Sequence, residues 1–289
     1  MQANAIKETK KRGFANFPFE VYRCRIPETF PFFPLHYHDD FEIVYVLEGT
    51  LDASVHAQRF ECSTGDILII PPQKIHGFFQ HKNLPCHYIN IVFSLSLLEQ
   101  PDSDFFKKFM SPYQNEQINL PYFHKKETLF NTKILESVIS LFNNRHEAVS
   151  KPFLVKSELF KIFHYLQEIV SDSDVKLNNS ELYANKLIPV FKYVSENYMN
   201  SISVADAAKL VNFSESHFMS IFKRIAGTSF TNYVKMIRLE NARVMLLSSD
   251  KSVQQIADEC GFEDISYFIR SFKKYINLSP LKYKKSAIV

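Results

Sequence analysis

Three histidines and one glutamate are the residues of this chain whose types and spacing could support metal or ligand chemistry. His36, His38 and Glu42 form an HxHxxxE pattern that leads into a run of β-branched residues, and His76 follows further along the chain. Imidazole nitrogens and carboxylate oxygens bind first-row transition metals, so a catalytic metal ion with open coordination positions is one interpretation. The same groups hydrogen-bond uncharged small molecules in polar pockets. The residue types alone leave both interpretations open.

The segments around these residues have the pattern of short β-strands. Residues 42–47, 67–70 and 88–93 are rich in β-branched or aromatic side chains and are separated by glycine and proline. Strands at such short intervals predict an antiparallel barrel or sandwich over residues 20–95. Over residues 127–170 the apolar side chains follow a helical period instead, which predicts two amphipathic helices after the barrel.

The composition changes after residue 170. Residues 171–180 (SDSDVKLNNS) are polar and have no periodic apolar face, so we predict a linker over 171–185 between domains at 1–170 and 186–289. Residues 186–289 carry 15 Lys and Arg against 9 Asp and Glu, whereas residues 1–185 have a net charge of −3. A basic C-terminal domain suits DNA, because binding to phosphates releases condensed counterions.

The basic domain contains an internal repeat. The segment that begins at Ser203 aligns with the segment that begins at Ser252, at an offset of 49 that becomes 50 near residue 263. Each copy has an N-cap serine, a turn residue that tolerates positive φ (Asn212 or Gly261) and two phenylalanines four positions apart. In the second copy, Gln255 completes a capping box. The pattern predicts a short helix, a tight turn and a second helix in each copy, which is a helix-turn-helix unit.

The second helix of each unit is predicted to offer one face to the DNA major groove. In the first unit this face comprises Ser216, Met219, Ser220 and Lys223. In the second unit it comprises Ser266, Ile269, Arg270, Lys273 and Lys274. Arg270 is the strongest candidate for reading a base, because arginine donates bidentately to guanine, whereas the lysines suit phosphate. The small or apolar face of the first unit favours methyl and shape contacts.

One long helix is predicted to join the two units. Residues 231–247 (TNYVKMIRLENARVMLL) are predicted to form a helix that could hold the two recognition helices roughly 34 Å apart, which is one DNA turn. Arg238 in this helix could contact phosphate or brace the helix.

The C-terminal pattern closely resembles the AraC family of bacterial transcription regulators. The segment YVKMIRLENARVMLL, then SVQQIADECGFEDISYFIRSFKKYINLSP and Tyr283 carry the resemblance, which covers Ile188 to Tyr283. Asn277 stands where the family usually has glycine, and asparagine tolerates the left-handed backbone that is needed there.

The N-terminal pattern resembles the two motifs of the cupin β-barrel. The departures are Phe30 and Gln73 at usual glycine positions and Gln80 at a usual asparagine. The resemblance implies that His36, His38, Glu42 and His76 face the barrel interior and bind the ligand, and these four would also hold a metal if one is present. Aromatic residues that could either stack on a sugar ring or belong to the core are Phe17, Phe19, Phe32, Phe33 and Tyr45.

These observations predict an α+β multidomain protein: a cupin-like barrel followed by amphipathic helices, then an all-α domain with two helix-turn-helix units joined by a long helix. The resemblance implies a transcription activator with promoter DNA, RNA polymerase and a second copy of the chain as partners, and a sugar as the commonest kind of effector. We expect a cytoplasmic protein with no cofactor, no membrane contact and no enzymatic activity. The alternatives are a metal-dependent cupin enzyme fused to a DNA-binding domain and a regulator controlled by a protein partner.

Overall fold

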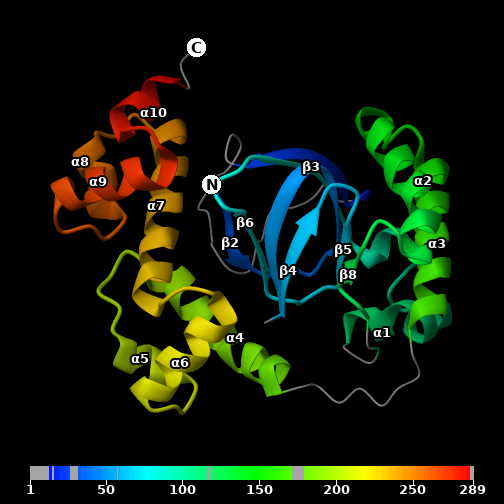
Figure 1. The fold of residues 1–289 in the computed structure, drawn as a ribbon, viewed down its shortest axis with the longest axis horizontal. Coiled ribbons are helices and arrows are strands. Elements are labelled where there is room, and N and C mark those ends of the chain that lie inside the picture. Colours follow the sequence, from blue (N-terminus) through cyan, green and yellow to red (C-terminus); the bar gives the residue numbers. More distant parts are fainter. Residues whose placement is uncertain are drawn as a thin grey trace. The chain divides into compact units, whose positions relative to one another are not determined.

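The computed structural model describes residues 13–14, 16–26, 32–56, 58–115, 118, 120–170 and 179–286 (Figure 1). The chain forms two structural units, one built mainly from residues 9–33 and 37–177 and the other containing residues 178–289. Residues 171–178 of the predicted linker lie outside the described residues. Helix α4 already begins at Asn179, within the remainder of that predicted segment.

The N-terminal unit is built on a sheet of eight strands. They are β1 (Phe19–Ile26), β2 (Phe32–His36), β3 (Phe41–Val55), β4 (Gln58–Ser63), β5 (Ile67–Ile70), β6 (His76–Gln80), β7 (Cys86–Phe93) and β8 (Phe123–His124). The order β1-β7-β3-β5-β8 forms one path; β3 also pairs with β4 and β6, and β2 pairs with β6. The strand-rich N-terminal domain is thus confirmed, with one short strand, β8, from outside the predicted range.

Strand β3 is long because it takes part in both halves of the barrel. Its first part pairs with β5 and β7, and its second part pairs with β4 and β6. The register shifts between Val46 and Glu48, and Gly49 follows with a φ of 86°. A Cβ at position 49 would collide with the carbonyl oxygen of Pro85. Glycine therefore permits both the backbone conformation and the close approach at this bend.

Alternate residues of β3 face two different cores. Phe41 and Ile43 belong to a core that includes residues of the two long helices of this unit, whereas Val44 and Val46 belong to a second core formed by strands. Since side chains alternate along a strand, Glu42 lies on the same inner face as Val44.

Helical segments follow the sheet strands. They are η1 (Leu95–Leu97), η2 (Phe106–Met110), α1 (Ser111–Gln114), α2 (Leu129–Asn143), η3 (Arg145–Glu147) and α3 (Pro152–Ile169). Helices α2 and α3 lie side by side (Figure 1) and share one core with the outer face of the sheet. Phe163 of α3 has its ring centroid 5.2 Å from that of Phe41 and 6.3 Å from that of Phe93. The two amphipathic helices are therefore anchored on the sheet by aromatic contacts.

The C-terminal unit is helical. Its helices are α4 (Asn179–Asn197), α5 (Val204–Leu210), α6 (Glu215–Ala226), α7 (Phe230–Ser248), α8 (Val253–Glu259), α9 (Ile265–Ile276) and α10 (Pro280–Ser286). The pairs α5–α6 and α8–α9 are the two predicted helix-turn-helix units, and α7 is the predicted long helix with one more residue at each end. Helix α10 and the early start of α4 are features that the repeat did not indicate.

The helix ends use the predicted residues. The Ser203 side chain accepts a hydrogen bond from the Asp206 amide at the start of α5. At the start of α8, Ser252 and Gln255 form the complete capping box. Each box or cap satisfies backbone N–H groups that the first helical turn leaves without an intrahelical partner.

The turns use residues that accept a left-handed backbone. The turn residues Asn212 and Gly261 have φ values of 56° and 80°. Asn277, with φ of 63°, ends α9 at the place where Gly227, with φ of 73°, ends α6. Asparagine at position 277 therefore supplies the conformation that glycine supplies in the first unit.

Helix α7 contributes to the hydrophobic cores of both helix-turn-helix units. On its N-terminal half, Phe230 and Tyr233 have ring centroids 5.2 and 5.5 Å from that of Phe222 in the first unit. On its C-terminal half, Leu239 and Leu246 belong to one cluster with Phe268 and Phe272 of the second unit, among others. Each unit therefore completes its core with a different half of the same helix.

Candidate nucleic-acid interface and barrel site

Helices α6 and α9 bury one face and expose the face predicted to meet DNA. The phenylalanine pairs Phe218 with Phe222 and Phe268 with Phe272 are fully buried. The predicted contact residues are all exposed: Ser216, Met219, Ser220, Lys223, Ser266, Ile269, Arg270, Lys273 and Lys274. The fold therefore leaves these side chains accessible to a duplex.

The start of α9 is capped more fully than the start of α6. Asp264 accepts hydrogen bonds from the amides of Ser266 and Tyr267, at 2.6 and 3.0 Å. At the start of α6, Ser214 accepts one bond from the His217 amide, at 3.4 Å. The Asp264 cap fixes the first turn of α9, from which a recognition helix contacts base edges.

An aromatic stack beside the first recognition face is a feature that sequence reasoning missed. The exposed His217 ring lies parallel to the Phe213 ring, with centroids 4.7 Å apart. The guanidinium of Arg224 lies over the ring of Tyr183 at 5.3 Å, and Tyr183 contacts His217 at 5.8 Å. Phe213 lies before the N-cap of α6, so helical spacing gave no signal for this stack.

Arg238 directs part of its guanidinium into the protein. Its Nε donates to the backbone oxygen of Tyr198 at 2.7 Å, and its Nη2 donates to the backbone oxygen of Asn200 at 2.8 Å. Of the two interpretations made from sequence, this geometry favours bracing over phosphate contact.

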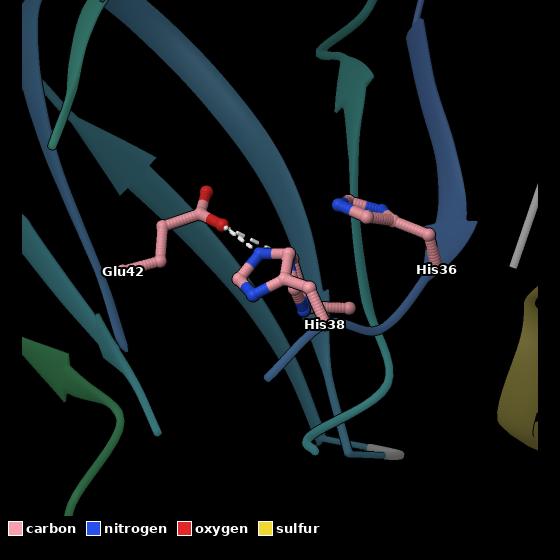
Figure 2. Close-up of side chains that lie close together, drawn as sticks. His36, His38 and Glu42 are labelled. Carbon is pink, nitrogen blue, oxygen red and sulfur yellow. Dashed lines mark hydrogen bonds and ion pairs between the residues drawn. The ribbon is translucent and has the colours of Figure 1, made fainter. Parts of the chain in front are cut away.

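The histidines and the glutamate of the N-terminal pattern come together. Each of His36, His38, Glu42 and His76 is buried and offers a ligand atom, and these atoms lie within 4.8 Å of one another. Figure 2 shows three of these side chains, with the Glu42 carboxylate directed at the His38 imidazole. The Nε2 atoms of His38 and His76 lie 2.8 and 3.1 Å from the same oxygen, Oε2 of Glu42.

The other nitrogen of each imidazole faces a backbone carbonyl. His38 Nδ1 lies 3.0 Å from the Asp40 oxygen, and His76 Nδ1 lies 2.7 Å from the Lys74 oxygen. A carbonyl oxygen only accepts, so each Nδ1 carries a proton and donates it. In the neutral imidazole the Nε2 lone pair then faces Glu42. Either the rings are protonated, or a cation is shared between the nitrogens and the carboxylate; a metal-binding histidine uses its second nitrogen in this same way. The donor set therefore fits a divalent metal ion.

Glu42 has one oxygen with no hydrogen-bond partner. Oε1 is buried and lacks a partner among the described residues. Burial by itself raises the pKa of Glu42, but the charge of His76 and the hydrogen bonds from both imidazoles outweigh it and hold the pKa well below its usual range. A buried, ionised carboxylate oxygen without a donor is costly, so this atom is suited to accept a bond from a bound molecule.

The inner face near Glu42 also carries aromatic rings. His76 and Phe78 lie on the same side of β6, with ring centroids 5.9 Å apart, and Tyr88 lies 5.7 Å from Phe78. Burial raises the pKa of Tyr88 well above its usual range, so its phenol keeps its proton. Phe78 and Tyr88 are the aromatic residues that sequence reasoning did not select.

The aromatic residues named for sugar stacking lie elsewhere. Phe17, Phe19 and Tyr45 belong to the core on the outer, helix-covered face of the sheet. Tyr45 lies three residues after Glu42 on β3 and therefore points to the opposite face of the sheet. All three side chains take part in the packing of the outer core. The side chains of Phe32 and Phe33 lie outside the described residues.

Two protein-family models match the chain. An AraC-like ligand binding domain matches residues 20–120, and a helix-turn-helix domain matches residues 207–286. The first range spans β1 to β7 apart from Phe19, and the second begins within α5 and includes both recognition helices, α6 and α9.

Curated relatives match along most of the chain. The raffinose operon transcriptional regulatory protein RafR of Pediococcus pentosaceus is 30% identical, over 86% of this chain and 86% of the relative. The Msm operon regulatory protein of Streptococcus mutans is 28% identical, over 86% of this chain and 84% of the relative. Among solved structures, ToxT of Vibrio cholerae is 14% identical, with 94% of this chain and 98% of that chain covered and a TM-score of 0.45.

A sensing barrel joined to two helix-turn-helix units defines a DNA-binding transcription regulator with small-molecule sensing. The chain belongs to the AraC family of transcription regulators. No helix in the described part of the chain is both long and apolar enough to cross a bilayer.

Proposed function

We propose that this regulator activates a carbohydrate-utilisation operon when a sugar binds in the N-terminal barrel. The relative RafR is named for a raffinose operon, which supports a carbohydrate as the class of effector. The proposal includes action in the cytoplasm, where promoter DNA is found, with RNA polymerase as a further partner, and no enzymatic activity is needed for it.

The observation that carries this proposal is the Glu42 carboxylate. It is buried on the inner face of β3, is ionised at neutral pH and leaves Oε1 without a donor. A sugar hydroxyl supplies the missing donor, and the neighbouring imidazoles can exchange further hydrogen bonds with hydroxyl groups. Phe78 and Tyr88 are buried in the core on the same inner face and form an apolar wall beside His76.

Thermal unfolding of the full chain with a panel of mono-, di- and trisaccharides, raffinose included, tests the proposal. A sugar at 100 times its dissociation constant should stabilise the protein by about 2.7 kcal/mol. Glu42→Gln keeps the shape of the side chain but removes its charge, and it should abolish the stabilisation. Asp52→Asn makes the same chemical change on the same strand and should retain it. An equal response in Glu42→Gln, or no response to any sugar, contradicts the proposal.

A second candidate is that the four side chains hold a divalent metal ion. The two Nδ1–H donations to backbone carbonyls favour it, because they leave both Nε2 atoms able to act as ligands. His36, His38, Glu42 and His76 would hold the ion, which would supply Lewis acidity toward a bound oxygen atom.

Metal analysis of the purified chain separates the two candidates. A content below about 0.1 ion per chain, with no thermal shift on adding Zn²⁺, Mn²⁺, Ni²⁺ or Fe²⁺, ends the metal candidate. A response to neither sugars nor metals favours the remaining alternative, a regulator controlled by a protein partner.

We also propose that the regulator is a dimer and that the exposed aromatic residues beside α3 form the contact. Phe153 is 87% exposed at the start of α3. Phe160 lies further along the same helix, and its ring centroid is 6.3 Å from that of Phe105. The ring centroid of Phe105 is in turn 5.0 Å from that of Phe109. A group of exposed phenylalanines costs solubility unless another surface covers it, and a second copy of this chain would also match paired DNA half-sites.

A further inference from the structure

The loop between α4 and α5 touches both α7 and the second helix-turn-helix unit. Arg238 of α7 donates to the backbone oxygens of Tyr198 and Asn200. From the other side, Gly261 in the α8–α9 turn comes so close that a Cβ there would lie 2.7 Å from the Met199 oxygen and 2.9 Å from the Tyr198 oxygen. The loop precedes the first unit, so it bridges the two units at a second place besides α7.

Arg238 occupies the point of α7 where the helix passes from one core to the other. Tyr233 packs in the first unit against Phe222 and Phe191. Leu239, one residue after Arg238, packs in the core of the second unit. A helix that carries a separate body at each end can bend or twist between them, and Arg238 is placed at that junction.

A cleft separates parts of the two units beside this junction. It has a volume of about 420 Å³ and is lined by residues 199–202, by Thr231, Val234 and Arg238 of α7 and by residues of the second unit that include Gly261 and Glu263. Across this cleft, the two arginine hydrogen bonds and the close approach of Gly261 connect the loop to α7 and to the second unit. The carboxylate of Glu263, in the second unit, attracts the Arg238 guanidinium electrostatically.

We propose that Arg238 and Gly261 fix the angle between the two helix-turn-helix units through the loop Tyr198–Asn200, and thereby set the spacing between the two DNA segments that one chain reads. Arg238 is in this view a positioning residue, and it acts on DNA through the placement of α6 and α9. A shift of one base pair moves a DNA segment by about 3.4 Å and rotates it by about 35°, so a fixed angle tolerates one spacing and rejects its neighbours.

Binding to duplexes of altered spacing tests the proposal. Duplexes that bind the full wild-type chain are first selected from a random library, and the spacer between the two contacted elements is then lengthened or shortened by one and two base pairs. The wild type should lose about tenfold in affinity for each one-base-pair change. Arg238→Met keeps the aliphatic bulk of the side chain and removes its hydrogen-bond donors. In this variant the affinity lost for each one-base-pair change should fall to about twofold. Duplexes that contain only one of the two contacted elements should bind the variant as tightly as the wild type.

Two results would overturn the proposal. The first is a wild-type spacing profile in Arg238→Met. The second is an equal loss of affinity for every duplex, including those with a single element, together with a salt dependence that corresponds to about one phosphate contact fewer. That pattern marks a direct contact between Arg238 and phosphate.

A second variant addresses the same contact from the opposite side. Asn212 adopts positive φ in the equivalent turn of the first unit, so Gly261→Asn can keep the backbone conformation while its Cβ pushes the loop away. It should relax the spacing preference as Arg238→Met does, and it carries the test if Arg238→Met is too unstable to assay. Asn212→Gly is the matched control. Equal relaxation in that control would attribute the effect to loosened turns in general and contradict the proposal.

Discussion

Among the positions predicted to face DNA, the two recognition helices differ in charge at one equivalent pair. Arg270 of α9 corresponds to Ser220 of α6 in the repeat, and both are exposed. An exposed arginine on a helix with a well-capped first turn can donate two parallel hydrogen bonds to guanine, whereas serine offers a single short hydroxyl. Hydrogen-bonded discrimination between bases should therefore depend mainly on the second unit.

Replacing Arg270 tests this difference. Arg270→Ala should weaken specific binding by about 1–3 kcal/mol and leave binding to random DNA nearly unchanged, because a base contact acts only at the correct site. Competition titrations with selected and random duplexes measure both. Lys274→Ala, on the same helix, is the control and should weaken the two classes equally. A uniform loss in Arg270→Ala would reassign the arginine to phosphate.

His124 gives the N-terminal unit a pH-dependent stability. Burial lowers the pKa of His124 to about 4, although a hydrogen bond to the Pro121 carbonyl works in the opposite direction. In the unfolded chain a histidine titrates near 6.5, so between about pH 6.5 and 4 the unfolded state binds more protons and stability falls as the pH is lowered. The full difference corresponds to about 3 kcal/mol.

Urea unfolding of the full chain at pH 7.5, 6, 5 and 4.5 measures this loss. His124→Phe removes the titrating group and keeps a ring against Phe130, whose centroid lies 4.3 Å away. The variant should lose less stability than the wild type over this range. Parallel curves for the two proteins would show that other groups cause the acid sensitivity.

At the level of elements, the caps and turns of the helix-turn-helix units could be predicted because their signals are local. The Ser252 and Gln255 pair and the positive φ of Asn212 and Gly261 depend on residues within a few positions of one another. The partners of Arg238 could not be predicted, since Tyr198 lies 40 residues away and presents only a backbone oxygen. Strand β8 could not be predicted for a similar reason: two residues are too few to show a periodicity, and only their pairing with β5 identifies them as a strand.

The barrel site was partly predictable. The HxHxxxE spacing indicated His36, His38 and Glu42, and a second motif indicated His76, but strand pairing was needed to show which oxygen both imidazoles share. Phe78 and Tyr88 carry no motif of their own. Their place on the inner face follows from the register of β6 and β7 against β3.

Removing the capping box should destabilise the second unit. Ser252→Ala deletes the acceptor for the Gln255 amide and should cost about 1 kcal/mol in the free energy of unfolding. Ser248→Ala, which removes an exposed hydroxyl from the end of α7, is the control and should have a smaller effect. Chemical denaturation monitored by circular dichroism compares the two. Equal losses would mean that the cap contributes nothing beyond a surface hydroxyl.

At the level of the whole molecule, the proposed dimer can be tested at its most exposed aromatic residue. Phe153→Glu places a charge on the proposed contact and should raise the dimer dissociation constant at least about tenfold, as measured by sedimentation equilibrium. Leu84→Glu makes a comparable change at another exposed apolar residue, before β7, and should leave it unchanged. A wild-type chain that sediments as a monomer at every concentration would refute the dimer.

The sharing of α7 between two cores has a consequence for how the DNA-binding domain unfolds. If α8 and α9 detach, Leu239 and Leu246 on α7 become exposed to water. If α5 and α6 detach, Phe230 and Tyr233 on the same helix become exposed instead. Opening of either unit therefore removes support from a helix on which the other depends, so backbone amides of both should exchange with solvent deuterium in one cooperative event. A fragment that contains one helix-turn-helix and only half of α7 should therefore be less stable than the same residues in the full chain, and we expect the duplicated sequence to unfold as one thermodynamic unit.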